Sequence, residues 1–320
     1  MMGRLLILAL GITTLVGSWF MTCQLWRYRE VASGVAWLEA RNFERLSAVT
    51  LGTGSAYENP QRLGPSTAIA IGDQVVLVDA GRGVAEALRK AEIPVDQARQ
   101  VFLTSLLPEN TVGLDDLLLT GWMAPRRAPL ALVGPPGTRA LADALLAAHG
   151  PAIEMLATRV GLPASGAVLD VTEVADVWSS EVGELTVRAA SVGRDGLPQL
   201  AYRFEARGRS IVVSGAGPER RALTALAKGA LVLIAEGFHA DSVEMAIEAG
   251  APDPERLRAE AALHTPFVEI GKIATDAGVA ALVLTRLRPP PLFDAQYQDP
   301  LESVFSGRIE LSGDGDTFSP

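Results

Sequence analysis

The loop between residues 105 and 110 holds side chains that are well placed to do chemistry. Val101–Leu103 is a short apolar run that predicts a strand, and Leu114–Thr120 predicts the start of a helix. A strand-to-helix loop is the usual place for a catalytic site on an α/β scaffold. The six loop residues are Ser105, Leu106, Leu107, Pro108, Glu109 and Asn110. A catalytic site is therefore one hypothesis for this loop.

A metal could assist hydrolysis there if enough ligands surrounded the loop. Zinc centres need neutral imidazoles and carboxylates at fixed places. The available side chains are Asp79, Glu109, Glu236 and His239. Glu236 and His239 are three residues apart, a spacing that suits a helix, but they fall at the boundary of a loop. We therefore expect no metal at these four residues.

Length and composition predict one large folded domain behind an N-terminal segment. The chain has 320 residues, and 48% of them are apolar, which suits a substantial core. The net charge of −9 argues against a nucleic-acid-binding surface, although a local basic groove is compatible with it. We expect no nucleic-acid partner. The single cysteine excludes an intrachain disulfide.

The N-terminal segment predicts a membrane anchor. Leu5–Trp26 contains no charged residue and is long enough to cross a bilayer as a helix. A cleaved signal peptide is the alternative, but no small-x-small site follows the run directly. Residues 1–28 are expected to form the anchor or signal segment and residues 29–46 a linker helix. The body is expected outside the cytoplasm, with a cytoplasmic orientation as the alternative, because arginines flank both ends of the run.

Residues 47–320 are expected to form a single α+β domain. Each half contains several predicted strands followed by helices, which fits a four-layer αββα sandwich. Separate helices are predicted over 138–149 and 151–160, with His149 at the end of the first. The last predicted strand is 308–311, and Ser312–Pro320 is expected to be a frayed tail.

Several segments give the domain a resemblance to the metallo-β-lactamase superfamily, in its ribonuclease Z/arylsulfatase-like branch. The family opens with a strand, a Leu-Gly-Thr-Gly turn and an Arg-x-Gly-Pro-Ser segment, and here these are residues 51–54 and 62–66. Asp79 ends the hairpin that follows, in a turn that lies near the metals in the family. A Pro-x-Leu-x-Tyr-Arg stretch is intact at 198–203. The resemblance covers nearly the whole domain and implies the αββα fold.

The metal-binding residues of the family are missing here, although the motifs that flank them are intact. Its usual site has two zinc ions held by five histidines and bridging aspartates, whereas this chain has three histidines in all. The former ligand positions fall on Ser105, Leu107, Glu109, Asn110, Gly193, Ala216 and Arg286. Arg286 puts a permanent cation where a metal ligand should sit. We expect no zinc, and we expect a buried Arg286 to pair with Asp79, Glu109 or Glu236.

One residue of the family's catalytic apparatus is retained. His264-Thr265 matches a His-Ser/Thr segment whose histidine assists the leaving group or binds substrate phosphate in the family. A helix-start histidine held by local hydrogen bonds, with Thr265 as the cap, is the structural alternative. His264 is the one candidate catalytic residue, and Asp79, Glu236 and Thr265 are its expected neighbours in the cleft.

Three functions are compatible with these features. The favoured interpretation is a membrane-tethered pseudoenzyme without a cofactor, whose old cleft binds a small ligand or a protein partner. The second is a metal-dependent hydrolase of phosphodiester or sulfate esters, with zinc in an unconventional site around His264, Glu109 and Asp79. The third is a structural role in the cell envelope. Transfer-RNA processing fits poorly, because a basic RNA-binding insertion is absent and the chain is acidic.

Overall fold

The computed structural model describes residues 2–35, 38–55, 61–124, 126–193, 196–217 and 219–320. It divides into two units, Met1–Glu39 and Ala40–Pro320. The first contains one helix, α1 (Met2–Val35). Leu5–Trp26 lies within α1, where the side chains of residues 2–10 and 12 are outside the described part. The predicted linker helix over 29–46 needs correction, because α1 continues to Val35 and a strand already begins at Phe43.

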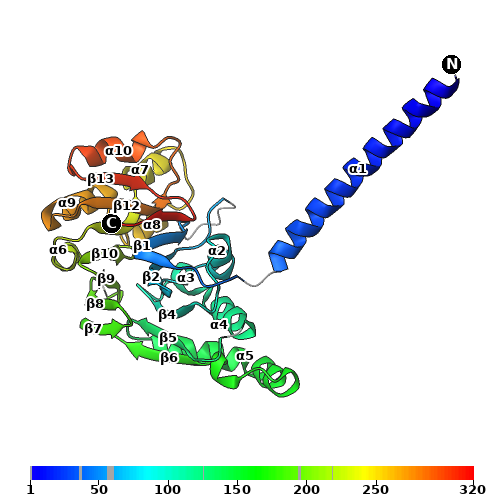
Figure 1. Cartoon of the computed structure of the whole chain (residues 1–320). Helices are drawn as coiled ribbons and strands as arrows, with labels where there is room; N and C mark the ends of the chain where they lie inside the picture. Colours follow the sequence, from blue (N-terminus) through cyan, green and yellow to red (C-terminus); the bar gives the residue numbers. More distant parts are fainter. Residues whose placement is uncertain (1, 36–37, 56–60, 125, 194–195, 218) are drawn as a thin grey trace. The chain divides into compact units, whose positions relative to one another are not determined.

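The second unit is built on two seven-stranded sheets (Figure 1). In spatial order, the first sheet contains β14 (Asp316–Phe318), β1 (Phe43–Gly52), β2 (Ser66–Gly72), β3 (Gln74–Val78), β4 (Ala98–Phe102), β5 (Leu130–Gly134) and β6 (Leu169–Glu173). The second contains β13 (Arg308–Leu311), β12 (Ala281–Arg288), β11 (Val232–Phe238), β10 (Arg209–Ser214), β9 (Leu200–Ala206), β8 (Leu185–Ser191) and β7 (Val177–Val182).

Helices cover the outer side of each sheet. The first sheet carries α2 (Val84–Lys90), α3 (Pro108–Thr111), α4 (Leu114–Met123), α5 (Thr138–Val160) and the 3₁₀ helix η1 (Ala164–Ala167). α6 (Arg220–Ala227), α9 (Phe267–Ala277) and α10 (Ala295–Glu302) pack against the second sheet. α7 (Asp241–Glu248) and α8 (Pro254–Ala261) follow β11 in the chain and contain no buried residue. The predicted α+β sandwich is confirmed for the described body.

Three apolar cores follow from this layering. Strand side chains alternate between the two faces of a sheet. In β2, Ile69 and Ile71 therefore enter the core between the sheets, while Ala68 and Ala70 face the outer helices of the first sheet. Phe102, Tyr202 and Phe204 form the aromatic centre of the middle core, with ring centroids 5.1–6.4 Å apart. The third core lies between the second sheet and α6, α9 and α10.

Two local predictions need correction. The predicted helices over 138–149 and 151–160 form one helix, α5, with Pro151 inside it. α5 is also the helix among the described residues that is long and apolar enough to cross a membrane, although it lies within the folded body. The predicted frayed tail contains β14, which pairs with β1. Asp314 accepts hydrogen bonds from the backbone N–H groups of Thr53 and Leu63, so the tail fixes a loop near the site.

Candidate functional site

The candidate side chains meet where the carboxyl ends of several strands come together. Asp79 directly follows β3, and Thr104 and Ser105 follow its parallel neighbour β4. In the second sheet, β11 contributes Glu236 and its parallel neighbour β12 ends at Arg288. The carboxyl ends of parallel strands are the usual place for binding sites in such sheets.

An inner polar cluster fixes the loop after β4. Both carboxylate oxygens of Asp79 accept from the Thr104 hydroxyl, at 3.0 and 2.8 Å, and Oδ1 also accepts from the Thr104 N–H at 2.8 Å. The amide nitrogen of Asn110 donates to Oγ of Thr104 at 3.0 Å and to Oγ of Ser105 at 2.9 Å. These bonds orient the oxygen of Asn110 towards Arg286. Burial raises the pKa of Asp79 to about 6, against the charge of Arg286 and the bonds from Thr104.

Arg286 is buried beside this cluster. Its guanidinium donates to the carbonyl of Ser214 at 2.9 Å and to Oδ1 of Asn110 at 3.4 Å. The predicted ion pair was wrong in its partners, since neither hydrogen bond goes to Asp79, Glu109 or Glu236. Its backbone has a φ of 51°, in the left-handed region that a bulky residue seldom adopts, and its N–H donates to Thr53 at 2.9 Å. Backbone and side chain together hold this cation inside the protein.

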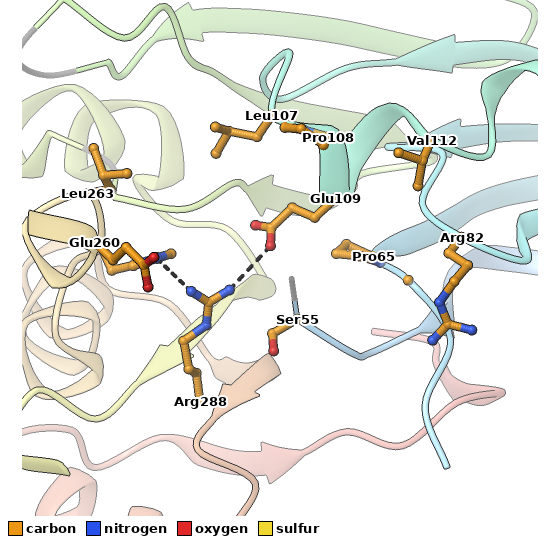
Figure 2. Close-up of a pocket in the computed structure, with 12 residues that line it drawn as sticks. Ser55, Pro65, Arg82, Leu107, Pro108, Glu109, Val112, Glu260, Leu263 and Arg288 are labelled. Atoms are coloured by element: carbon orange, nitrogen blue, oxygen red, sulfur yellow. Dashed lines mark hydrogen bonds and ion pairs between the residues drawn. The ribbon is translucent and has the colours of Figure 1, made fainter. Parts of the chain in front are cut away.

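A second, outer cluster connects four residues in a chain of hydrogen bonds. Glu236 Oε2 lies 2.8 Å from Nδ1 of His264, Nε2 of His264 lies 2.9 Å from Nη1 of Arg288, and Nη2 of Arg288 lies 3.2 Å from Oε2 of Glu109. Figure 2 shows the guanidinium of Arg288 with its two dashed interactions, one of them to Glu109. The predicted cleft residues His264, Glu236 and Glu109 are thus brought together.

The protonation state of His264 follows from these contacts. A guanidinium can only donate, so Nε2 of His264 must accept from Arg288, and the ring proton lies on Nδ1, facing Glu236. Burial raises the pKa of Glu236, but the hydrogen bond from His264 and the charges of Arg286 and Arg288 outweigh burial and lower it. Glu236 is therefore a carboxylate that orients a neutral imidazole.

Two cavities meet at the outer cluster. One has a volume of about 580 Å³ and includes Arg82, Leu107 and Glu109 in its wall. The other has a volume of about 510 Å³ and a more apolar wall. Arg62 is its cation in addition to Arg288. Both are lined by Ser55, Glu260, His264 and Arg288. In Figure 2, Arg288 and Glu109 form a pair on the wall of the first cavity, and Arg82 lies apart from them, beyond Pro65.

The residues present do not fit the family's zinc centre. Among the described residues, no group of three or more His, Cys, Asp and Glu side chains could hold a metal ion. Leu107 and Ala216 offer no ligand atom, and Arg286 contributes a buried cation. A divalent ion about 5 Å from that cation would be repelled by roughly 6–7 kcal/mol at an effective dielectric constant of about 20. At Gly193 an added Cβ would lie 2.3 Å from the carbonyl oxygen of Leu197, so a histidine does not fit there.

The other predicted candidates lie outside the chain of hydrogen bonds from Glu236 to Glu109. His239 packs against Phe267 and Tyr297, with ring centroids 5.1 and 5.6 Å away. His149 lies mid-helix, 3.3 Å from a carboxylate oxygen of Asp115, rather than at a helix end. Thr265 is buried next to His264, and the cap position of the helix that follows, α9, is occupied by Pro266.

Arg288 was missed by the sequence analysis. It contacts both His264 and Glu109. The available signal was the Arg-x-Arg pattern of residues 286–288 at the end of a predicted strand, because alternate strand residues share a face. That pattern alone did not reveal that one arginine is buried and the other lines the cavities.

The two-sheet architecture and this arrangement of loops define a metallo-β-lactamase-like fold. A search of protein-family models found no match. Ribonuclease Z of Mycobacterium sp. (strain KMS) is 34% identical over 275 residues, which span 84% of this chain and 94% of that protein. The metallo-β-lactamase fold protein YhfI from Bacillus subtilis has a TM-score of 0.64 at 17% identity, covering 86% of this chain and 100% of that one. Human tRNase Z, short form, has a TM-score of 0.64 at 18% identity and coverages of 86% and 99%.

The chain belongs to the metallo-β-lactamase superfamily, in its ribonuclease Z branch. Two expectations were wrong. The pseudoenzyme interpretation is contradicted by the relatives, which are named ribonuclease Z. The expectation of no nucleic-acid partner fails on the same finding. Its error was to use the net charge of the whole chain, which does not describe the cavities, where Arg62, Arg82 and Arg288 lie beside Glu109 and Glu260.

Proposed function

We propose that this chain cleaves phosphodiester bonds and that RNA is its substrate class. The observation that carries the proposal is the Glu236–His264–Arg288–Glu109 cluster at the junction of two cavities. The relatives named ribonuclease Z favour RNA phosphodiesters over sulfate esters. The proposal keeps the ester hydrolase that was the alternative interpretation of the sequence and omits its metal, because the donor set does not fit zinc.

Arg288 is suited to hold the phosphate. A guanidinium can give two parallel hydrogen bonds to phosphate oxygens. Two of its nitrogens now contact His264 and Glu109, so a phosphate placed there would have an imidazole on one side and a carboxylate on the other. Arg82 in the first cavity and Arg62 in the second add charge for neighbouring phosphates.

The two cavities favour a diester over a monoester. A diester phosphate carries two substituents, and the shared residues Ser55, Glu260, His264 and Arg288 lie where the cavities meet. A nucleotide unit could therefore extend from the phosphate into each cavity. The second cavity has Phe238, Val243, Leu257 and Leu287 in its wall, an apolar lining that suits a nucleobase.

Cleavage and binding of short RNA by the purified chain test this function. We expect the wild-type protein to cleave single-stranded RNA and His264→Ala to lose about 10²–10⁴-fold of the rate, the usual contribution of a general acid–base group. His149→Gln is the matched control, since His149 lies on α5 with Asp115 as its partner. Equal rates for His264→Ala and the wild type would contradict the proposal, as would an absence of both cleavage and binding.

We propose separately that α1 crosses a membrane, with the body outside the cytoplasm. This rests on the sequence of Leu5–Trp26, which has no charged residue and sufficient length. Residues 1–28 then form the anchor, and residues 47–320 contain the catalytic domain. The test is alkaline extraction of membranes from cells that express the chain, followed by protease treatment of cells that are opened at the outer surface while the cytoplasmic membrane stays intact. Release of the protein by alkali would contradict the anchor, and protection of the body in cells opened only at the outer surface would contradict its orientation.

A further inference from the structure

We infer that the site cleaves RNA through the 2′-hydroxyl of the substrate itself, with Nε2 of His264 as the base that accepts its proton. This inference rests on the proposed function and deepens it. The starting point is the donor set, in which Leu107, Gly193, Ala216 and Arg286 replace metal ligands. These positions cannot assemble a centre that generates a metal-bound hydroxide, so the nucleophile must be activated by side chains alone.

The Glu236–His264 pair has the arrangement of a general base. Both side chains are almost fully buried, and the 2.8 Å contact between Oε2 and Nδ1 fixes the ring orientation. Phe238 packs against the imidazole with a centroid distance of 5.1 Å, which further restrains it. With its proton on Nδ1, His264 presents the lone pair of Nε2 towards the cavities, and Glu236 stabilises the imidazolium that forms when Nε2 takes a proton.

Arg288 covers this lone pair before a substrate binds. Its Nη1 donates to Nε2 of His264 at 2.9 Å. An incoming phosphate is a better acceptor for a guanidinium than a neutral imidazole, because the bond then joins two opposite charges. Phosphate binding therefore draws Arg288 away from Nε2 and exposes the base next to the bound phosphate. The same residue thus links recognition of the phosphate to availability of the base.

The proposed step balances without any further reactant. Nε2 of His264 takes the 2′-hydroxyl proton, and the 2′-oxygen forms a bond to the adjacent phosphorus. The bond between phosphorus and the 5′-oxygen breaks, its electron pair stays on that oxygen, and the oxygen takes a proton from a water molecule. The proton on Nε2 then passes to the resulting hydroxide, which restores both the water and the base. The products are a 2′,3′-cyclic phosphate and a 5′-hydroxyl. Arg288 neutralises the charge that accumulates on the phosphate oxygens during this step.

An internal nucleophile suits a site with one base and no metal. The 2′-oxygen is already tethered beside the phosphorus, and such intramolecular reactions gain effective molarities of about 10⁵–10⁸ M over bimolecular ones. A water molecule would have to be held and oriented by additional groups. The consequence is a substrate requirement, because DNA has no 2′-hydroxyl and is therefore bound without being cleaved.

The test uses the full chain, extensively treated with a chelator, and three end-labelled oligonucleotides of one sequence. The first is RNA, the second carries a single 2′-deoxynucleotide on the 5′ side of the mapped cleavage position, and the third is DNA. We expect cleavage of the RNA with a 2′,3′-cyclic phosphate end, and a loss of at least about 10²-fold at the substituted position. Binding of the substituted RNA, measured by fluorescence anisotropy, is expected to stay unchanged.

The possible failures are distinguishable. Products with a 3′-hydroxyl and a 5′-phosphate, or undiminished cleavage at the 2′-deoxynucleotide, would overturn the internal nucleophile and leave the proposed function standing. Binding of all three oligonucleotides without cleavage would overturn the inference while supporting phosphate recognition. His264→Gln separates chemistry from binding, since it should abolish the cyclic product and retain affinity, and His149→Gln should behave as the wild type. Formation of the cyclic product by His264→Gln at the wild-type rate would exclude His264 as the base.

Discussion

Replacement of Arg288 by alanine is expected to weaken RNA binding more than removal of any one surface charge. Arg288 has two guanidinium nitrogens at the cavity junction, directed to His264 and Glu109 at 2.9 and 3.2 Å. If these nitrogens move to a phosphate, two charge-assisted bonds form, each worth about 1.5–3 kcal/mol. Part of this energy is offset by the two bonds that are given up, so a net loss of about 2–3 kcal/mol is expected. That corresponds to a roughly 30–150-fold higher Kd.

Arg288→Lys refines the prediction. Lysine keeps the charge but loses the planar fork, so we expect about a tenfold loss of affinity, between wild type and alanine. Arg188→Ala is the charge-matched control, because Arg188 is half-exposed on β8, where it pairs with Glu205 at 2.7 Å. It removes the same formal charge outside the two cavities.

Fluorescence anisotropy with labelled RNA at fixed ionic strength measures these affinities, and chemical denaturation confirms that each variant is folded. The salt dependence is recorded as well, since Arg288→Ala should reduce its slope by about one phosphate contact. If Arg288→Ala binds RNA as tightly as Arg188→Ala does, phosphate recognition at this cluster is refuted.

Three further predictions concern the inner cluster and the backbone around the site. Because burial raises the pKa of Asp79 from 3.8 to about 6, the folded chain keeps a proton there that the unfolded chain has lost. The resulting stabilisation of roughly 3 kcal/mol is complete below about pH 4 and is lost as the pH rises through about 6. The free energy of unfolding of the wild type, taken from denaturation curves, should therefore fall over this pH range, and that of Asp79→Asn should lack this fall. Gly193→Ala should destabilise the fold by about 1–3 kcal/mol through its clash with Leu197, whereas Gly150→Ala, with open space in α5, should not; equal melting temperatures would argue against the closed backbone at Gly193. Asp314→Ala should cost about 2–4 kcal/mol and lower RNA cleavage, because the backbone N–H groups of Thr53 and Leu63 lose their acceptor; an unchanged unfolding midpoint would show that the tail does not hold this loop.

The fold was largely predictable from the sequence because its turns and strand ends are marked by local residue patterns. The turn after Leu51 and the Gly72-Asp73 hairpin each mark an element by residue type and spacing, and the intact 198–203 stretch carries the family resemblance. The failures occurred where tertiary contacts override local signals. Pro151 does not break α5, and the polar tail gains order from Asp314 and from β14 pairing with β1.

Most members of the candidate site were predictable from the sequence, but Arg288 and the geometry of the site were not. Asp79, Glu109, Glu236 and His264 were all expected near one cleft. Nothing in the sequence distinguishes an inner cluster around Arg286 from an outer one around Arg288, because the separation depends on how β11 and β12 end. The pairing of these strands shifts register between Glu236 and Phe238, and Arg286 takes a left-handed backbone. A periodicity argument assumes regular strands, so it cannot anticipate which arginine reaches the cavities.

The most direct measurement is the rate of RNA cleavage by chelator-treated wild-type protein, compared with that of His264→Gln purified in parallel. With the Glu236–His264–Arg288–Glu109 cluster as the site, the wild type should cleave at a rate that is insensitive to the chelator, and His264→Gln should be slower by at least about 10²-fold. Stoichiometric zinc in the untreated protein, with cleavage abolished by its removal and restored by its return, would contradict a site made of side chains alone.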